Sequence, residues 1–550
     1  MAFNPNSTIY LCNVPIDNTY QNQIYFSSKT EQQSYFSQRV QKTFSNYLTV
    51  RKTLPDGSLV SSVKVDCNID DLYNCNYMYY QNANHGTRYF YAFITKLIYI
   101  NEGTTEIRFE TDVYQTWRFD VTLKQSYVVR EHSLTDEIGD NVVPESFTVA
   151  DTRYIKISDS ITDIGQWGYL IACTECILYD DFNKPNPGKH SGIYQGLYFY
   201  FFKSPIHIND FISRLDDKGS DSILSITAIP EISVKHAKMD WRTIDSGGNV
   251  VDHTDIGLIY TTDYPNEKSF TINANDVTKM DGHTVINNKL WSFPFFSLIV
   301  SNNSGNTVEY NIDDFTDRSK IKFNLYGDIS TNPSLILTPQ NYKGVSETSN
   351  EDDIYGECCD FGISIGGFPQ CAFVNDYYKL WSAKNMGSNV MGYASGVAST
   401  VAGVALAVTG NPLAGAGAIA GGVSAVANTI NKSYSASIEP DHATVGTPKN
   451  NLITGMKRNK FDMRFKTLKR EQAETIDNFF TMYGYQTNLL KVPNVSSRPY
   501  FNYVQTVDCN IEGAIPDDDM RQLKAMYNNG VTLWKSTATV GDYSVDNSPS

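Results

Sequence analysis

Residues Thr87–Ile100 read TRYFYAFITKLIYI, and this stretch decides the fold class of the chain. It is too aromatic and β-branched for a good helix, so it predicts a strand, and Asn101-Glu102-Gly103 supplies the turn after it. Apolar and charged residues then alternate: Ile107, Phe109 and Val113 with Glu106, Arg108, Glu110 and Asp112. This alternation predicts a return strand with one apolar and one charged face. The charged face, where acids are in excess, is either ordinary solvent-exposed surface or the wall of a wide polar channel.

The rest of the chain has the same bias towards strands. Its 550 residues include 36 Tyr, 28 Phe and 6 Trp, and Ile, Val and Thr are plentiful, whereas Ala and Leu are sparse outside one segment. We therefore predict a mainly β protein. At roughly 150 residues per domain, the length suffices for three to four domains.

The charge balance is acidic. Lys and Arg number 45 and Asp and Glu 60, which gives a net charge of −15, and both signs are scattered along the chain. Tight binding to nucleic-acid phosphates needs clustered cations that release counterions, so this class of function is disfavoured. An acidic protein can still let DNA slide past it.

Nine cysteines show no framework of spacings, and a disulfide scaffold is unexpected in a chain of this length. The N-terminus has neither a basic region nor an apolar run of signal-peptide length, so we expect synthesis and folding in a reducing cytoplasm, with most thiols buried. The pair Cys173-x-x-Cys176 has the spacing of a redox pair or half a zinc site, but no second pair lies at matching spacing. Two buried strand cysteines are the favoured interpretation.

Three helices and one strand have clear local signals. Thr30–Gln33 fits a capping box and predicts a helix that buries Tyr35, Phe36 and Val40. A second helix is predicted over Arg470–Tyr483, with Gly484 as its C-terminal cap and an apolar face made of Ala473, Ile476, Phe480 and Tyr483. A third is predicted from the aspartates at 517–519 to Asn529-Gly530, and residues 500–507 between them read as a strand.

The order of these segments suggests a domain organisation. Residues 1–150 and 432–550 form the two parts of one β domain, residues 151–340 form one or two inserted β domains, and residues 341–384 connect back to the first domain. Turns are predicted at Asn186-Pro187-Gly188, at 246–249 and at 302–305, and the acidic stretch 346–353 reads as a solvated loop. No tandem repeat with a period of 20 to 50 residues is visible.

Two motifs mimic enzyme signatures. Gly362-Ile-Ser364-Ile-Gly366 matches the nucleophile elbow, but Gly-Gly-Phe-Pro follows where the elbow needs a helix. Gly415-x-Gly417-x-x-Ala420 mimics a dinucleotide fingerprint, but no buried strand leads directly into it. We therefore predict no enzyme, no catalytic or metal-binding residue and no cofactor.

One segment differs from everything else in the chain. Between Lys384 and Lys432 lie 47 residues without a charge, rich in Gly, Ala, Ser and Val. Its two halves, Met386–Thr409 and Pro412–Asn431, would each be roughly 30 Å long as helices, the thickness of a bilayer's hydrocarbon core. Small residues four apart would let the two helices pack closely in lipid. The residues we assign to membrane insertion are Met391, Gly392, Gly396, Val401, Val404, Leu406, Pro412, Leu413, Gly417, Ile419, Gly421 and Val423.

Two interpretations of this segment remain open. In one, a Gly/Ala hairpin packs against its own protein or its symmetry mates. In the other, it is a conditional membrane-inserting hairpin, because its apolar strength is too modest for a permanent anchor but suits storage inside an assembly and insertion after release.

Short phrases along nearly the whole chain carry a family resemblance. They are Asn13–Tyr20, Asp112–Trp117, Arg130-Glu-His132, Ile138-Gly139, Pro144-Glu145, Gly327–Ser330, Asn332-Pro333, Asn341–Gly344, Phe368–Gln370, Asn375-Asp376, Tyr378-Lys379, Trp381, Phe479–Tyr485 and Ser497–Tyr503. In these phrases and their order the chain resembles the tail-knob, or distal tail-tube, proteins of small short-tailed bacteriophages of Gram-positive hosts. Residues 200–310 match least well.

The resemblance implies a homohexameric, mostly β tube at the distal end of the tail in the virion. It also implies that one hydrophobic loop per subunit plugs the lumen, then enters the host membrane and forms a channel for the genome; residues 385–431 lie at the matching position. The implied partners are the lower collar or tail-tube protein of the same phage, a tail-tip enzyme that degrades the cell wall, the host cytoplasmic membrane, and double-stranded DNA that passes without specific binding. An excess of acid in the lumen would keep DNA from sticking to the wall.

Two other classes of function stay open. The β domains between residues 150 and 340 could bind a receptor or a cell-wall glycan while the charge-free hairpin is only a plug. An enzymatic alternative would make Ser364 a nucleophile.

Overall fold

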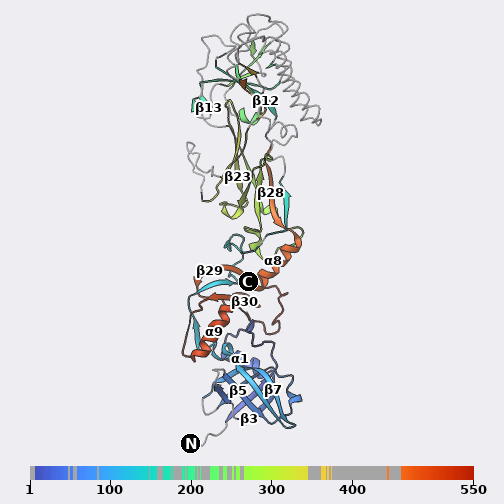
Figure 1. Ribbon diagram of the computed structural model, residues 1–550, viewed down its shortest axis with the longest axis vertical. Helices are drawn as coiled ribbons and strands as arrows, with labels where there is room; N and C mark the ends of the chain where they lie inside the picture. The colour runs from blue at the N-terminus through green and yellow to red at the C-terminus, as the bar shows by residue number, and fades with distance from the viewer. Residues whose placement is uncertain are drawn as a thin grey trace. The chain divides into compact units, whose positions relative to one another are not determined.

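The structure is a computed structural model. It describes residues 6–47, 50–53, 59–82, 86–147, 149–157, 164, 166–174, 176, 189–190, 193–194, 196–204, 207–208, 211, 223–234, 239–244, 250–252, 256–259, 266–344, 361–366, 368–370, 373–374, 443–444 and 460–549. The chain divides into two compact units, and each is interleaved with the other in sequence. Unit 1 comprises Met1–Asp151, Lys279–Phe295 and Leu468–Ser550, and unit 2 comprises Thr152–Thr278 and Phe296–Thr467. Strands dominate both units, which confirms the predicted mainly β fold (Figure 1).

Unit 1 contains a seven-stranded antiparallel sheet in the order β3-β1-β6-β7-β8-β5-β4. Its strands are β1 (Ser7–Cys12), β3 (Val40–Tyr47), β4 (Val50–Thr53), β5 (Leu59–Val65), β6 (Tyr77–Asn82), β7 (Tyr89–Asn101) and β8 (Thr104–Thr111). Successive residues of β6 point to opposite faces, so Tyr77 and Tyr79 enter one apolar core and Met78 and Tyr80 another. The sheet is therefore covered by apolar side chains on both faces in this region.

The predicted hairpin is confirmed as β7–β8, with Ile107 and Phe109 buried. The return strand is shorter than predicted, because it ends at Thr111 and the Asp112 carboxylate caps helix α2 (Val113–Trp117), accepting the Gln115 N–H at 3.0 Å. Asp112 is therefore buried instead of on the charged face, and Val113 lies on the helix.

Helix α1 (Lys29–Ser37) begins earlier than predicted. Its cap is Ser28, whose hydroxyl accepts the Glu31 N–H at 3.2 Å, while the Glu31 carboxylate accepts the Ser27 N–H at 2.9 Å. The prediction of Thr30 as the cap was wrong because Glu31 supplies the reciprocal contact of a capping box to residues upstream of Thr30. Tyr35 and Phe36 are buried as predicted, whereas Val40 is half-buried and begins β3.

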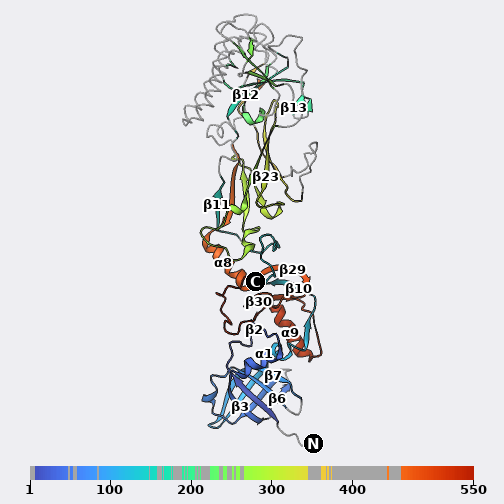
Figure 2. The same ribbon diagram turned by 180° about the vertical axis from the view of Figure 1, so that it is seen from behind.

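A five-stranded sheet joins the two ends of the chain within unit 1. Its order is β2-β32-β30-β10-β29, with β2 parallel to β32 and the other pairs antiparallel. The strands are β2 (Asn22–Ile24), β10 (Ser126–Glu131), β29 (Tyr485–Lys491), β30 (Phe501–Val507) and β32 (Val531–Trp534), and β9 (Val121–Leu123) pairs separately with β31 (Ile511–Gly513). Figure 2 shows β10, β29 and β30 together. The strand predicted at 500–507 is confirmed as β30.

Both C-terminal helices are confirmed as α8 (Arg470–Tyr483) and α9 (Asp517–Asn529). Each ends where a glycine takes a positive φ, 63° at Gly484 and 91° at Gly530, a backbone conformation that glycine adopts without steric cost. Ala473, Ile476 and Phe480 are buried on α8 as predicted, and Tyr483 is half-buried.

The described residues of unit 2 form three larger sheets in the orders β11-β28-β21-β22, β16-β12-β15-β19-β17-β18 and β20-β23-β24-β25, and two strand pairs, β13-β14 and β26-β27. The strands are β11 (Thr152–Lys156), β12 (Trp167–Cys173), β13 (Lys189–His190), β14 (Ile193–Tyr194), β15 (Tyr198–Phe202), β16 (Ile223–Pro230), β17 (Met239–Ile244), β18 (Val250–Asp252), β19 (Ile256–Ile259), β20 (Asn266–Ile272), β21 (Ser297–Ser301), β22 (Thr307–Asn311), β23 (Ile321–Gly327), β24 (Leu335–Gln340), β25 (Ile363–Ile365), β26 (Phe373–Val374), β27 (Ala443–Thr444) and β28 (Asp462–Leu468). The 3₁₀ turns of the two units are η1 (Ile69–Leu72), η5 (Glu231–Val234), η6 (Ala274–Asp276), η7 (Asn288–Trp291) and η8 (Ile312–Asp314).

The turn predicted at 302–305 is confirmed between β21 and β22. The turns predicted at 186–188 and 246–249 and the loop at 346–353 lie outside the described residues. Of the six described cysteines, five are buried as predicted, and Cys67 is half-buried.

Candidate functional site

The residues assigned to membrane insertion lie between 385 and 431, outside the described residues. The glycine motif at 415–420 also lies outside the described residues. Among the helices that the structure does describe, none combines the length and the apolar character needed to cross a bilayer.

Ser364 lies in a regular strand. It is exposed in the middle of β25, and its register partner is Ile336 of β24. A nucleophile elbow places its serine at a sharp turn from a strand into a helix, so this extended backbone agrees with the non-catalytic interpretation. Cys173 is buried at the end of β12, and Cys176 is buried just beyond that strand. Within the described part of the chain, no three His, Cys, Asp or Glu side chains are placed to hold a metal ion.

Unit 1 contains an ion cluster centred on Glu145, whose side chain is fully buried. The Lys289 ammonium lies 2.9 Å from one carboxylate oxygen, which also accepts the Gln486 N–H at 2.9 Å, and the Arg130 guanidinium pairs with the other oxygen. Burial lowers the pKa of Lys289, and the charge of Glu145 opposes this shift. Two cations thus depend on one buried carboxylate, and the three residues come from different segments of the chain.

The neighbouring Glu131 and His132 are also fixed by structural contacts. The buried Glu131 carboxylate pairs with the Lys491 ammonium and accepts the Asn494 N–H at 2.8 Å. Nδ1 of His132 accepts the Tyr503 N–H at 2.7 Å, so Nε2 carries the proton and donates to the Thr481 carbonyl at 3.1 Å. Burial, followed by the charge of Arg498, lowers the pKa of His132 to about 3. His132 is therefore a neutral linker between β10, β30 and α8.

A third set of contacts surrounds Asp477 on α8. Its carboxylate accepts backbone N–H groups of Ile286 and Asn287 at 2.8 and 2.9 Å, and it lies 2.7 Å from Nε2 of His283. A fourth set surrounds Asp112, which accepts the Tyr77 hydroxyl at 2.9 Å; burial raises the pKa of Asp112 to about 6. In each set the acid is engaged by donors that hold strands and helices together, as expected for structural polar groups in a large core.

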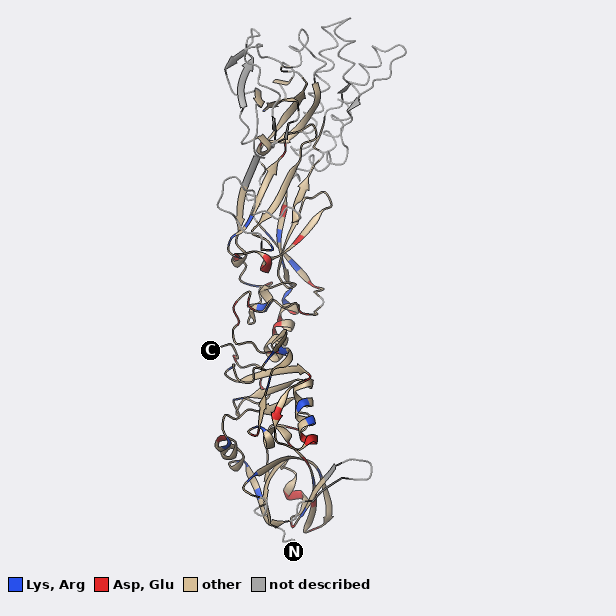
Figure 3. Ribbon diagram, turned by 90° about the vertical axis from the view of Figure 1, so that its left-hand side faces the viewer, with Lys and Arg blue, Asp and Glu red and all other residues tan. Residues whose placement is uncertain are grey.

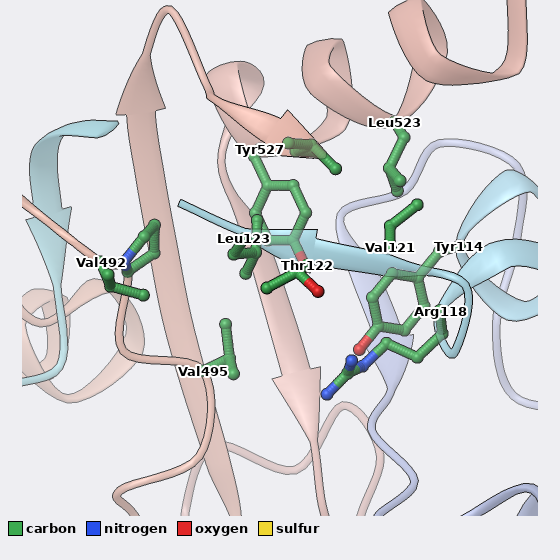
Figure 4. A pocket seen from close by; sticks show the side chains of 11 residues that line it. Tyr114, Arg118, Val121, Thr122, Leu123, Val492, Val495, Leu523 and Tyr527 are labelled. Carbon is green, nitrogen blue, oxygen red and sulfur yellow. The ribbon is translucent and has the colours of Figure 1, made fainter. Parts of the chain in front are cut away.

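Sequence reasoning missed a pocket in unit 1 that has a volume of about 300 Å³. Most of its wall is aliphatic, and its lining residues are Tyr114, Arg118, Val121, Thr122, Leu123, Val492, Pro493, Val495, Ile511, Leu523 and Tyr527 (Figure 4). In the close-up, the Tyr114 hydroxyl and the Arg118 guanidinium lie next to each other. Tyr114, Arg118 and the residues at 121–123 are close in sequence, but the remaining walls come from residues 492–527, nearly 400 residues away. No local pattern therefore predicts the pocket.

Acidic and basic residues are interspersed along the described elements (Figure 3). This distribution agrees with the scattered charge of the sequence, and along the described residues it forms no basic stripe of the kind that binds nucleic-acid phosphates.

Comparisons with known proteins point to one kind of virion component. The model of the C-terminal domain of the tail knob protein gp9 of Bacillus phage phi29 matches residues 260–548, and the model of the N-terminus of caudoviral major tail proteins matches residues 6–122. The chain is 26% identical to the tail knob protein gp9 of Bacillus phage PZA and 26% identical to that of phi29, in each case over 98% of this chain and 97% of the relative. The fold is similar to that of the tail knob protein gp12 of bacteriophage C1, with a TM-score of 0.60 and 16% identity over 98% of this chain and 99% of the other.

Proposed function

Since the chain belongs to the family of the phi29 tail knob protein gp9, we propose that it forms a hexameric tube at the distal end of a phage tail and carries its own membrane-penetrating segment. As a tail knob protein it is a structural component of the virion and not an enzyme, and it assembles with other tail proteins. Residues 385–431, one copy per subunit, plug the lumen before infection. They then enter the host cytoplasmic membrane and line the channel through which the genome leaves.

The observation that carries this proposal is the charge-free segment itself. This run of 47 residues contains no Asp, Glu, Lys, Arg or His, whereas 19% of the residues of the whole chain are charged. Each charged side chain at the centre of a bilayer costs about 2.5 to 3.5 kcal/mol on insertion scales, so a segment that must enter lipid cannot tolerate many. Gly and Ala keep its hydrophobicity low enough for storage inside a soluble assembly.

The acidic net charge of the chain is compatible with passage of DNA. Each subunit has a net charge of −15, so a ring of six carries 6 × −15 = −90, and in our proposal the lumen shares this excess of carboxylates. Such a wall repels phosphates, and a conduit works only if its cargo does not bind along the way. The further partners we propose are the lower collar or tail-tube protein above the ring and a cell-wall-degrading protein at the tip.

The proposal is tested with a synthetic peptide that covers residues 385–431. It should release an entrapped dye from liposomes, and Val401→Asp or Ile419→Asp should abolish release, whereas the matched Val401→Ala should not. A charge at mid-segment is decisive because the apolar gain of a Gly/Ala-rich helix is small. Equal leakage from the Asp and Ala peptides would leave the segment as a lumen plug only.

A further inference from the structure

The guanidinium of Arg118 is a half-buried charge with an unusual environment. It lies 4.9 Å from the ring centre of Tyr25 and 5.8 Å from that of Phe119, and the Tyr114 hydroxyl lies beside it as a hydrogen-bonding group. Among the residues that the structure describes, no carboxylate lies within ion-pair distance of it. Buried cations are usually paired, and a guanidinium presents five N–H donors in a fork that matches a carboxylate. No described carboxylate thus supplies the anion that this position suits.

The pocket beside Arg118 favours a ligand that has an apolar part as well as a negative charge. Val121, Leu123, Val495 and Leu523 give it apolar walls, and its volume of about 300 Å³ is at the small end of the range for binding pockets. A carboxylate on a short aliphatic stem, as in a Glu or Asp side chain, fills such a space with its stem against the walls and its oxygens against Arg118 and Tyr114.

An apolar surface adjoins the mouth of this pocket through Val492, which lines the pocket and is 53% exposed. In the five-stranded sheet, Tyr127 is paired in register with Leu490 on one side and with Val507 on the other. Residues in register across antiparallel strands share a face, and these three are 44%, 68% and 56% exposed. We call Tyr127, Leu490, Val492 and Val507 the apolar row.

The strand that carries Leu490 is also the edge of the sheet. β29 pairs only with β10 among the described strands of its sheet, so it is an edge strand, and of its backbone groups the Gln486 N–H is already bound by Glu145. An apolar edge strand is an aggregation hazard unless a partner covers it. A ring of identical subunits covers such a surface without a further protein, and a copy of this chain has carboxylates in excess, 60 against 45 basic residues.

We propose that the Arg118 pocket and the apolar row form the surface onto which a second copy of the chain docks, with a carboxylate side chain of that copy bound to Arg118. This inference rests on the ring of the proposed function and specifies where one of its contacts lies. The carboxylate is the buried anchor of the contact, and the apolar row excludes water around it.

The experiment measures the oligomeric state of the purified full-length chain by mass photometry across a concentration series. Arg118→Gln removes the charge and keeps much of the bulk, and Leu490→Asp places a charge in the apolar row. Each should weaken association by roughly ten-fold or more, because each leaves an unpaired charge or polar group in the contact. The matched controls are Arg521→Gln, whose guanidinium is exposed on α9, and Leu134→Asp, at a 70% exposed leucine outside the row; both should associate as the parent chain does.

A competitor tests the pocket in the unaltered chain. Millimolar hexanoate should weaken association, and hexanol at the same concentration should not, because only the acid can pair with Arg118. Association of Arg118→Gln and Leu490→Asp at parental strength, with no effect of hexanoate, would overturn the inference. A parent chain that stays monomeric at all concentrations would instead contradict the ring of the proposed function.

Discussion

Replacing Glu145 by Gln should destabilise unit 1 far more than its single lost charge suggests. The carboxylate is fully buried between Lys289, which is 1% exposed, and Arg130, which is 12% exposed. Gln keeps the shape and an acceptor for the Gln486 N–H, but it leaves two cations without their anion. Arg130 retains the Gly484 carbonyl at 2.7 Å, whereas Lys289 loses its ion-pair partner.

The expected magnitude follows from the burial of the pair. Removing one partner of a buried ion pair costs about 3 to 5 kcal/mol, a large share of a typical unfolding free energy of about 5 to 15 kcal/mol. A second change, Lys289→Met, should restore part of the loss, because the uncompensated ammonium is then absent. The control is Glu512→Gln, since Glu512 pairs with Lys124 at the surface and should contribute less than about 1 kcal/mol.

The assay is hydrogen exchange with mass spectrometry on the full-length chain, read on peptides that cover β10. In Glu145→Gln the most protected amides should exchange roughly a hundred-fold faster or more, at about 1.4 kcal/mol per factor of ten. The pH dependence has a defined sign. The pKa of Lys289 is already lowered by burial and falls further without Glu145, so raising the pH discharges Lys289 and the deficit of the variant shrinks by at most about 1.4 kcal/mol per pH unit. Exchange in Glu145→Gln within a factor of two of the parent would refute the reasoning.

Three further outcomes are expected. Ser364→Ala should leave infection intact, and a covalent adduct of Ser364 with a fluorophosphonate probe would contradict this. Deleting residues 386–430 should leave soluble rings visible by electron microscopy, because the segment is compositionally an insertion; loss of soluble assemblies would make it part of the core. Unit 1 should lose stability in acid because of His132. Burial lowers the pKa of His132 to about 3 in the folded chain, against about 6.5 in the unfolded chain. The free energy of unfolding should therefore fall as the pH drops from 6.5 towards 3, by about 2 kcal/mol at pH 5. His132→Gln, measured by urea unfolding, should lack this loss, and an unchanged acid slope would count against the assignment.

Local signals were sufficient to predict several elements. α8 followed from its apolar face and Gly484, and α9 followed from the aspartates at 517–519 and from Asn529-Gly530. The β7–β8 hairpin followed from its alternation and turn. The errors were also local. Asp112 continues the alternation of the return strand but caps α2, and Thr30 fits a capping box although Ser28 is the cap of α1.

Pairings between distant segments could not be predicted from the sequence. β10 lies between β29 and β30, which are more than 350 residues away in sequence, and the residues of β10 do not predict this pairing. The same is true of the Glu145 cluster and of the Arg118 pocket, whose walls are brought together only by the folded sheet and α9. From the sequence alone, Arg118 and Glu145 would be interpreted as ordinary surface charges, because only the fold shows what surrounds them.

The central claim is that residues 385–431 enter the host membrane during infection. It is tested most directly by comparing phage that carry Val401→Asp with matched phage that carry Val401→Ala, scored for adsorption and for genome delivery. A charge at mid-segment costs about 2.5 to 3.5 kcal/mol in the bilayer, equivalent to a factor of about a hundred for one copy. We predict that both phages adsorb normally and that only the Asp phage loses delivery, by a hundred-fold or more. Delivery by the Asp phage at the efficiency of the Ala phage would contradict the claim.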